Sequence, residues 1–564
     1  MLMAATSWSQ TINIGGHRAV HDSINDIWLC SIPQSLFGDD FSAVVTYGDD
    51  IYDLVIEEHP LESGDSYYFS AIEGGKNYSI SLVAGDSLIT GNLTFTWLPI
   101  VELEGTFDNS YKYGTVTVSE PDSAYAEPLM AKLKWRGGAT NTLSKHKRNY
   151  RIKFVNEEDS TKQNHRFFGL RKDNNWILDA GQMDFLRVRN RVSTDLWLDM
   201  ARRPWYSDTL PNVHNGSRGK MVEVILNGEY AGIYNMCEPI DRKQLKLKRY
   251  DEENETFNGA LWTAYTWTRT VTMSKPAKRG TNSRFWDGFE AKYPDLDETR
   301  KVTWDVLDNA VKFAGRADKD TLLYIDSIGE YFDMPVMQDY YIFIVTLQAL
   351  DNESKNIYYG CHDMNDNHRL TMVPWDLDIC LGQDYSPQVS RPDIIKPERQ
   401  VDWISHVPMA DMVQIEEYWN QILERYRELR ETKLNTDSLV NRYRAAIDEL
   451  ENSGAAAREE NRWSRDQDLA KKVLDLSQEM DYVEDWLRRR MAYLDENVFI
   501  KRINYGMKGD VNNDKEINIA DVNALIDIIL GAAYDEGTFF RADINSDNEL
   551  NIIDLNGIID LILN

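Results

Sequence analysis

The stretch Asp351-Asn352-Glu353-Ser354-Lys355-Asn356 joins an apolar helical run, residues 340–350, to a short strand that begins at Ile357. A second strand, Leu370 to Val373, returns and ends in Pro374-Trp375-Asp376-Leu377-Asp378. Apolar periodicity before the loop and alternation after it predict helix, loop and hairpin in that order. Acidic and amide side chains therefore sit before the hairpin, and carboxylates sit at the strand end after it.

A glycine-containing loop and a basic strand lie upstream. The loop is Trp135-Arg136-Gly137-Gly138-Ala139-Thr140, and the basic segment runs from Lys145 to Phe154. Glycines let backbone amides approach an anion, and basic side chains nearby can complete a phosphate cradle. Strand alternation places Lys153 on the face opposite Ile152, from which it could enter a cleft. Taken alone, each pattern is more typical of an ordinary hairpin and a solvated lysine.

A third segment, Val222 to Tyr234, predicts a β-hairpin with Asn227-Gly228 at its turn. It continues into Glu238-Pro239-Ile240-Asp241. The order along the chain is therefore glycine loop, basic strand, hairpin, acidic loop and acidic strand end.

In this order, the segments resemble the CotH (spore-coat protein H) family of atypical secretory-pathway protein kinases. The resemblance covers about residues 100–500. The segments that carry it are Arg136-Gly137 with Lys147 to Phe154, Trp176-Ile177-Leu178 with Arg189-Asn190, the Leu226 to Tyr230 hairpin ending at Glu238, Asp351 with Asn356 and Tyr358, and Pro374 to Asp378. The loop reads Arg-Gly-Gly-Ala where an Asn- or Ser-containing turn is expected, and the hairpin before Asp376 is long and polar.

The resemblance implies a kinase-like, two-lobed α+β core that uses ATP with Mg²⁺ or Mn²⁺ to phosphorylate Ser/Thr of secreted proteins. Protein kinases use Asp-x-x-x-x-Asn with the Asp as general base and the Asn on a metal. Asp351 and Asn356 would take these roles. Asp376 would hold metal, with Asp378 as its support or as the true ligand.

The same resemblance implies cationic contacts to the nucleotide. Lys153 would hold the phosphates, and Lys147 and Arg151 are rivals for that role. Arg136 would contribute from the glycine loop. Glu238 would face the nucleotide site, either contacting adenine or pairing with a lysine.

Two acidic loops, offset by 33 residues, occupy residues 508–564. Each places carboxylate or amide oxygens at positions 1, 3, 5, 9 and 12 of a 12-residue loop, the spacing from which calcium draws its oxygen ligands. These residues are Asp510, Asn512, Asp514, Asn518 and Asp521 in the first loop, and Asp543, Asn545, Asp547, Asn551 and Asp554 in the second. An apolar helix-like run follows each loop.

This duplication resembles a type I dockerin, which implies two Ca²⁺ ions and a cohesin module on another protein as partner. Position 6 is Lys515 in the first loop and Asn548 in the second, where an EF-hand has glycine. Asn tolerates a left-handed backbone better than Lys, so the first loop is expected to be the more strained. Positions 10 and 11 are the apolar pairs Ile519-Ala520 and Ile552-Ile553.

Composition places limits on partner and compartment. The chain has 564 residues, 42% hydrophobic, and a net charge of −30, which argues against nucleic acid or an anionic membrane as partner. No stretch reaches the roughly 18 apolar residues of a membrane span. Four scattered cysteines fit buried free thiols at least as well as a Cys361–Cys380 disulfide. No histidine cluster suggests Zn²⁺.

The dockerin-like tail suggests a secreted protein in a cell-surface complex. Met1 to Ala5 lacks a basic n-region, so a signal peptide is not visible, and we expect that it was removed or lies upstream. We predict three domains: a β-sandwich-like domain at 1–100, a CotH-like kinase domain at 101–500 and a dockerin module at 508–564. Residues 415–430 and 466–497 are predicted to be amphipathic packing helices.

Three alternatives to an active kinase remain at this stage. The core could be a non-catalytic pseudokinase in a structural or adhesion component of a cellulosome-like complex. It could transfer AMP on the same fold. A glycoside hydrolase is a common dockerin cargo, but nothing marks an acid and nucleophile pair, and the kinase-like order is then unexplained.

Overall fold

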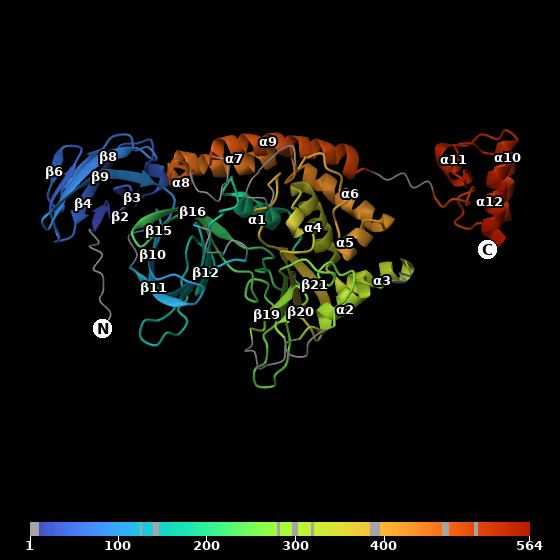
Figure 1. The fold of residues 1–564 in the computed structure, drawn as a ribbon, viewed down its shortest axis with the longest axis horizontal. Helices are drawn as coiled ribbons and strands as arrows, with labels where there is room; N and C mark the ends of the chain where they lie inside the picture. Colours follow the sequence, from blue (N-terminus) through green and yellow to red (C-terminus); the bar gives the residue numbers. More distant parts are fainter. Residues whose placement is uncertain are drawn as a thin grey trace. The chain divides into compact units, whose positions relative to one another are not determined.

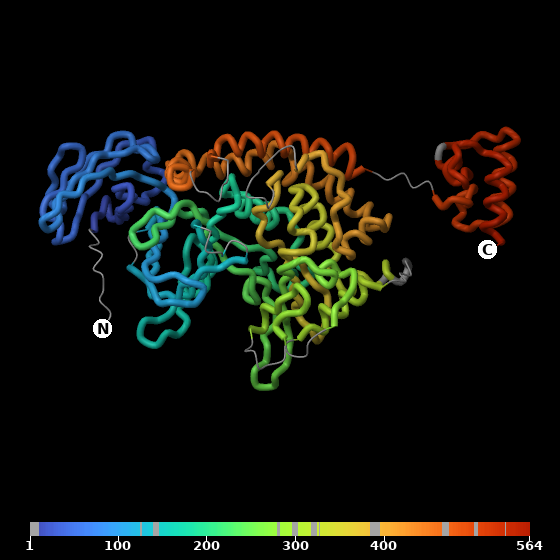
Figure 2. Tube along the Cα trace, in the orientation of Figure 1, coloured from blue at the N-terminus to red at the C-terminus, as the bar shows by residue number. Residues whose placement is uncertain are grey.

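The fold mixes helices and sheets in two compact units, residues 1–499 and 500–564 (Figures 1 and 2). This computed structural model describes residues 11–123, 127–138, 141, 146–278, 283–295, 303–316, 321–383, 395–464, 473–500 and 506–563. The α+β class predicted from the sequence is confirmed. The two-lobed kinase arrangement, the dockerin module and the three domain ranges stay predictions.

The first described segment forms a nine-stranded sheet with the order β6-β5-β8-β9-β3-β2-β1-β4-β7. Its strands are β1 (Ile12–Ile14), β2 (His17–Asp22), β3 (Ile27–Ser31), β4 (Phe41–Tyr47), β5 (Ile51–Ile56), β6 (His59–Leu61), β7 (Ser66–Phe69), β8 (Asn77–Ala84) and β9 (Ser87–Thr96). Val45 and Phe69 from one end of the sheet share a core with Leu54 and Ile80 from the other. The sheet therefore curls around its own apolar face.

A closed seven-stranded barrel follows, in the order β10-β11-β12-β13-β14-β16-β15. Its strands are β10 (Ile100–Gly105), β11 (Lys112–Ser119), β12 (Leu129–Arg136), β13 (Asn149–Phe154), β14 (Asn175–Asp179), β15 (Gly219–Leu226) and β16 (Glu229–Cys237). The interior is apolar, with Leu133, Ile152 and Trp176 in one core cluster. Closure removes the exposed sheet edges that an open sheet would leave.

The predicted hairpin is confirmed as β15 and β16. Asn227 and Gly228 have φ values of 49° and 79°. Positive φ at both central positions is the requirement of a two-residue turn that matches strand twist, which explains the Asn-Gly pair.

The rest of the first unit is largely helical and contains a five-stranded sheet, β18-β19-β17-β20-β21 (Figure 1). The strands are β17 (Ala260–Ala264), β18 (Phe285–Trp286), β19 (Phe289–Tyr293), β20 (Ile357–Asp363) and β21 (Asn367–Pro374). The helices are α1 (Arg189–Met200), α2 (Asp305–Ala314), α3 (Thr321–Tyr331), α4 (Met334–Leu347), α5 (Val407–Met412), α6 (Glu416–Arg430), α7 (Thr436–Asn452), α8 (Ala455–Trp463) and α9 (Leu476–Tyr493).

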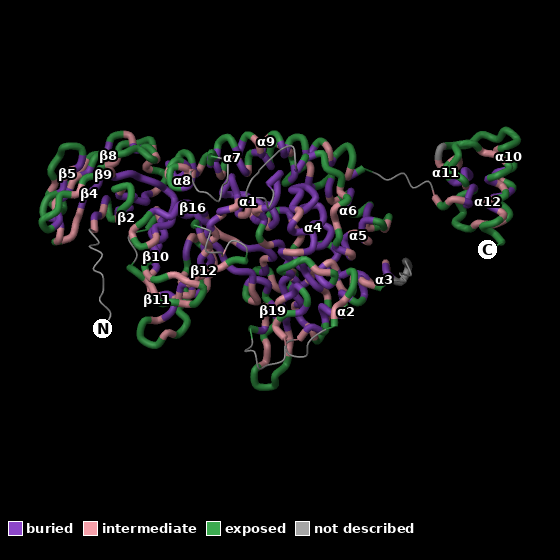
Figure 3. Tube along the Cα trace, in the orientation of Figure 1, coloured by how far each residue is buried: buried purple, intermediate pink, exposed green. Residues whose placement is uncertain are grey.

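Helix α4 forms the centre of this part, because all of its residues except Pro335 are buried (Figure 3). The amphipathic segments predicted at 415–430 and 466–497 contain α6 and α9, with apolar faces in the main core. Residues 466–472 of the second segment lie outside the described residues.

Helix α8 joins the barrel through a buried carboxylate, Glu459, whose side chain has no exposed surface. Its Oε1 accepts from Lys147 Nζ at 2.7 Å and Arg187 Nε at 2.6 Å, and its Oε2 accepts from Ile233 N at 2.7 Å. Gly232 lies so close that an added Cβ would be 2.1 Å from Oε2. Burial works to raise the pKa of Glu459, but Lys147 and Arg187 outweigh it, so the carboxylate stays ionised.

The described residues of the second unit form three helices, α10 (Ile519–Ile529), α11 (Glu536–Ala542) and α12 (Ile552–Leu563). Val511, Val522, Leu525, Ala542 and Ile558 form its buried core. This core is small, which limits the stability that apolar burial alone provides.

All four cysteines, Cys30, Cys237, Cys361 and Cys380, are buried free thiols, so Cys361 and Cys380 are not bonded. Within the described residues, no helix combines the length and apolar character needed to cross a membrane.

Glu459→Ala is expected to lower the free energy of unfolding by about 3–5 kcal/mol, because it leaves Lys147 and Arg187 buried without their carboxylate partner. Urea denaturation followed by tryptophan fluorescence measures the change. Glu451→Ala removes an exposed carboxylate just before α8 and should change stability by no more than about 0.5 kcal/mol. Equal effects of the two substitutions would show that the buried cluster is not a structural tie.

Candidate active site

The predicted acidic loop follows α4 and is held by its own side chains. Gln348 ends the helix in the left-handed region at φ 50°, and Asp351 then lies in a short 3-10 turn, Leu350–Asn352. Asp351 is 3% exposed. Its Oδ2 accepts hydrogen bonds from Lys355 Nζ at 2.7 Å and Asn356 Nδ2 at 2.8 Å. The carboxylate is thus fixed beside a cation and an amide at the start of β20.

Two hydrogen bonds join this loop to the Pro-Trp-Asp-Leu-Asp loop after β21. Trp375 N donates to Asn356 O at 2.9 Å, and Asn352 Nδ2 donates to Trp375 O at 2.7 Å. Asn356 and Asp376 both have positive φ, 55° and 61°. Such backbone costs free energy and is concentrated at functional sites. The two sequence-predicted acidic segments are therefore brought together as one unit.

Asp179 and Asn190 belong to the same site, although neither was predicted to act in it. Asp179 ends β14, and its Oδ2 accepts from Asn190 Nδ2 at 2.6 Å. Asn190 Oδ1 in turn accepts from Leu377 N at 3.1 Å. The sequence signal was present: an acidic residue ends a strand, and the Arg189-Asn190 pair opens the next helix.

Asp179, Asp351, Asp376 and Asp378 form an acidic cluster in which like charges repel one another. Burial, together with Asp179 and Asp351, raises the pKa of Asp376 to about 6, against the opposing effect of Arg136. Burial and the neighbouring Asp376 raise the pKa of Asp378 well above its usual range. Buried like charges require a compensating cation or a proton. Carboxylate and amide oxygens are hard donors, so this set suits Mg²⁺ or Mn²⁺.

Cations line the facing side of the barrel. The β12–β13 register places Lys132 opposite Lys153, Lys134 opposite Arg151, and Arg136 opposite Asn149. Alternation sends these side chains to one face, while Leu133 and Ile152 enter the barrel core, as predicted for Lys153 and Ile152. The result is a strip of positive charge on a sheet whose other face is apolar.

Arg136 lies closest to the acidic cluster among the predicted phosphate contacts. Its guanidinium lies 5.4 Å from the Trp375 ring centroid. Arg151 is next along the strip and donates from Nε to Asn175 Oδ1 at 2.6 Å; burial and Arg136 lower its pKa. Lys153 lies two residues beyond Arg151 on β13, and its Nζ is 4.8 Å from the Tyr111 ring centroid. Burial and Arg151 lower the pKa of Lys153.

Lys147 and Glu238 lie away from this arrangement. The Lys147 side chain is fully buried against Glu459, so reaching a nucleotide would require breaking that ion pair. Glu238 pairs with an arginine instead of a lysine: Arg218 Nη2 donates to its Oε1 at 2.8 Å. Ala139 and Thr140 of the glycine loop, and residues 142–145 after it, lie outside the described residues.

The two tail loops have matching internal contacts. Asp510 accepts from the backbone of Asp514 and Lys515, and Asp543 accepts equivalently from Asp547 and Asn548. Both sixth positions are left-handed, with φ of 73° at Lys515 and 66° at Asn548.

The carboxylates at position 12 of the two tail loops also make matching hydrogen bonds. Asp521 accepts from Asn512 N and Asn518 N, and Asp554 accepts from Asn545 N and Asn551 N. In the second loop, ligand atoms of Asp543, Asp547 and Asp554 lie within 4.8 Å of one another.

A family model described as "CotH kinase protein" matches residues 133–494, which is more than half of the chain. The match contains the cationic strip except Lys132, both acidic loops and Asn190. It confirms the predicted CotH resemblance over that range. No curated protein matches the chain.

Asp376→Asn is expected to stabilise the metal-free protein at pH 7. The carboxyl pKa rises from 3.8 to about 6 on folding. Between these two pH values, the folded chain therefore keeps a proton that the unfolded chain has lost. Stability therefore falls as pH rises through this window. At about 1.4 kcal/mol per pH unit, the ionised carboxylate costs about 3 kcal/mol at pH 7.

Urea unfolding in EDTA at pH 4 and pH 7 measures this cost. The loss of stability between the two pH values should be smaller in Asp376→Asn than in wild type. Asp366→Asn, in the exposed turn of the β20–β21 hairpin, is the matched control and should behave as wild type. An Asp376→Asn protein no more stable than wild type at pH 7 would rule out the repulsive cluster.

Proposed function

The chain belongs to the CotH kinase family, and we propose that it is an atypical protein kinase that transfers the ATP γ-phosphate to a Ser or Thr hydroxyl of a secreted or surface protein. One observation carries the proposal. Asp351, with Lys355 and Asn356 on its Oδ2, is hydrogen-bonded through its loop to the loop of Asp376. Opposite them lies the cationic strip that begins at Arg136.

In the proposed reaction, Asp351 is the general base. The hydroxyl oxygen of the acceptor attacks the γ-phosphorus, its proton passes to Asp351, and the bond to the β–γ bridging oxygen breaks to release ADP. Lys355 and Asn356 hold the Asp351 carboxylate in one orientation, which is the positioning that phosphoryl transfer requires.

The acidic loops supply the proposed metal contacts, and the cationic strip supplies the proposed phosphate contacts. Asn356 and Asp376 would hold Mg²⁺ or Mn²⁺, with Asp378 as a support or an alternative ligand. When bound, the ion neutralises charge on the phosphate oxygens. Arg136 and Arg151 are the proposed phosphate contacts nearest these carboxylates. Lys153 keeps a phosphate role only for a nucleotide that extends along the strip. Lys147 acts indirectly, because its ion pair with Glu459 fixes the chain just before β13.

Incubation with Mg²⁺ or Mn²⁺ and ATP labelled separately on the γ- and α-phosphates tests the proposal. We expect γ-label on the protein itself or on a generic Ser/Thr acceptor. Asp351→Asn should lower the transfer rate by about 10²–10⁴-fold, the usual contribution of general base catalysis, while Asp366→Asn should retain it. Label from the α-phosphate would instead indicate AMP transfer, and nucleotide binding without either transfer would indicate a pseudokinase.

We also propose that residues 508–564 form a type I dockerin module that binds two Ca²⁺ ions and a cohesin on a scaffold or surface protein outside the cell. The paired loops around Asp510 and Asp543 support this proposal through their matching backbone contacts. Exposed apolar residues supply a docking face: Ile519, Ile526, Ile529 and Leu530 on or after α10, and Ile552, Ile553, Leu561, Ile562 and Leu563 on α12. A small unit with this much exposed apolar surface is typical of a binding module.

Removal of calcium should unfold the tail and spare the rest of the chain. Each loop gathers carboxylates that repel one another without a cation, and the core of the tail is small. Hydrogen exchange of the whole protein should therefore accelerate in residues 506–563 on adding EDTA and stay unchanged in the barrel. With calcium present, Asp543→Ala should accelerate exchange around the second loop. Asp527→Ala, on an exposed position of α10, should not; chelator-insensitive exchange would refute the calcium sites.

A further inference from the structure

A cationic cleft of about 350 Å³ lies in the first unit and shares no lining residue with the acidic cluster or the β12–β13 strip. Residues 166–171, 212–218 and 238–246 supply its walls. The charged and polar lining residues are Arg166, Arg171, Asn212, His214, Arg218, Glu238, Lys243, Gln244 and Lys246. Five cations therefore surround one carboxylate in a chain whose net charge is −30.

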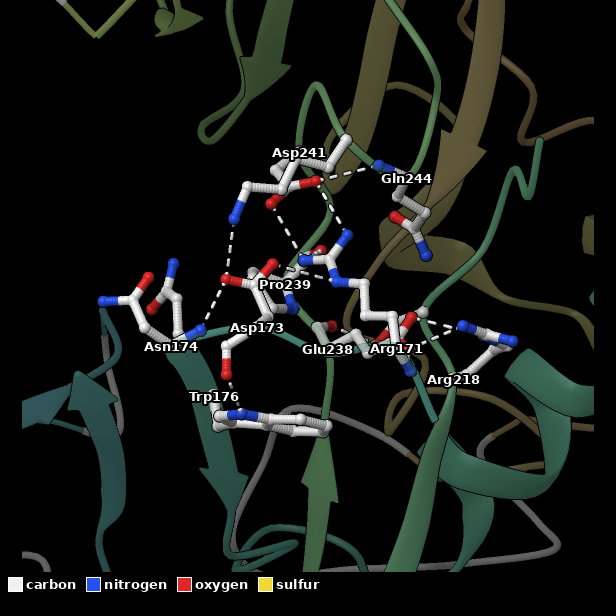
Figure 4. A network of polar contacts seen from close by, with 12 residues as sticks. Arg171, Asp173, Asn174, Trp176, Arg218, Glu238, Pro239, Asp241 and Gln244 are labelled. Carbon is white, nitrogen blue, oxygen red and sulfur yellow. Dashed lines mark hydrogen bonds and ion pairs between the residues drawn. The ribbon is translucent and has the colours of Figure 1, made fainter. Parts of the chain in front are cut away.

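Two buried carboxylates and one half-buried carboxylate, Asp241, hold three of the cations of the cleft. Figure 4 shows Arg171 and Arg218 among these carboxylates. Glu238, 1% exposed, accepts from Arg218 Nη2 at 2.8 Å and from Arg171 N at 3.0 Å. Asp241 binds both terminal nitrogens of Arg171, at 2.9 and 2.8 Å. Asp173, also buried, accepts from Lys243 Nζ at 2.8 Å. These groups are pre-oriented, so binding a ligand would cost little side-chain entropy.

The charges do not cancel. Five cations and three carboxylates (Glu238, Asp173 and Asp241) leave two positive charges in excess. Three of the lining cations are exposed, and one of them, Lys243, pairs with Asp173. In the described part of the chain, no carboxylate forms an ion pair with the other two, Arg166 and Lys246, which we call the rim cations. Burial and the charge of Arg218 lower the pKa of His214, which lines the same cleft. An anion is the ligand that this excess favours.

We propose that the cleft binds a phosphate dianion, either as inorganic phosphate or as the phosphate of a phosphorylated serine or threonine on a protein. A phosphate monoester carries about −1.5 to −2 charge at pH 7, which matches the excess of two. Arginine offers paired N–H donors that fit phosphate oxygens, and Arg218 uses only Nε and Nη2 on Glu238. The proposal does not depend on the kinase activity of the acidic cluster.

Calorimetric titration of the full chain with a phosphoserine peptide, its unphosphorylated counterpart and inorganic phosphate tests the proposal. We expect the phosphoserine peptide to bind at least tenfold more tightly than the serine peptide. Tighter binding of the phosphopeptide than of inorganic phosphate assigns a phosphorylated protein as ligand, and equal affinity assigns the free ion. No binding of either phosphate form would overturn the proposal.

Two matched double variants test whether phosphate binds in this cleft. Arg166→Gln/Lys246→Gln removes the two rim cations without exposing a buried carboxylate, and it should weaken phosphate binding at least tenfold. Lys162→Gln/Lys172→Gln removes the same charge from exposed positions that do not line the cleft and should leave affinity within twofold. Equal losses in the two variants would mean that bulk charge is responsible, which would overturn the site.

Two further conditions separate this cleft from the proposed nucleotide site. Phosphate binding should persist in saturating Mg²⁺-ATP and in Asp376→Asn, because the cleft and the acidic cluster share no residue. Competition by ATP that disappears in Asp376→Asn would show that the bound phosphate occupies the nucleotide site, and the separate cleft would then be rejected.

Discussion

A single buried carboxylate, that of Glu459, fixes the geometry on which the rest of the first unit depends. It contacts Lys147 near the start of β13, Arg187 ahead of α1, and the backbone of Ile233 in β16. An ionised group in an apolar interior is tolerated only when each of its oxygens has donors. The requirement for Gly232 beside it follows from the same contact, because a side chain there would occupy the position of the carboxylate. Helix α8 is thereby tied to both barrel strands and to the entrance of α1.

The candidate active site also buries carboxylates, but it does not surround them with enough cations. Asp376, Asp378, Asp179 and Asp351 approach one another with too few cations to neutralise them, and the pKa of Asp376 rises as a result. Where Glu459 is satisfied by protein groups, this cluster lacks such compensation, and the metal ion that we propose there would supply the missing positive charge. The backbone strain at Asn356 and Asp376 points the same way, since such strain persists where surrounding contacts enforce it.

Positive charge in this acidic chain is gathered in places where an anion would meet it. The β12–β13 strip faces the carboxylates of the proposed catalytic site, and the cleft around Arg218 forms a second concentration held by Glu238, Asp173 and Asp241. The cleft's rim cations keep charge that these three carboxylates do not neutralise. Both features rely on buried carboxylates or strand register to hold like charges together, because free side chains would separate.

The sequence by itself determined the local elements and the chemistry available to them. Alternation predicted the face of Lys153, Asn227-Gly228 predicted its hairpin turn, and the helix–loop–hairpin order predicted the two acidic loops, because these properties depend on neighbours in the chain. Only the tertiary structure decided which charges meet. Lys147 and Arg136 flank the same loop, yet one is buried against a residue more than 300 positions away and the other reaches Trp375. Glu238 and Asn190 likewise acquired Arg171 and Leu377 as partners through long-range packing, which strand periodicity and motif spacing do not encode.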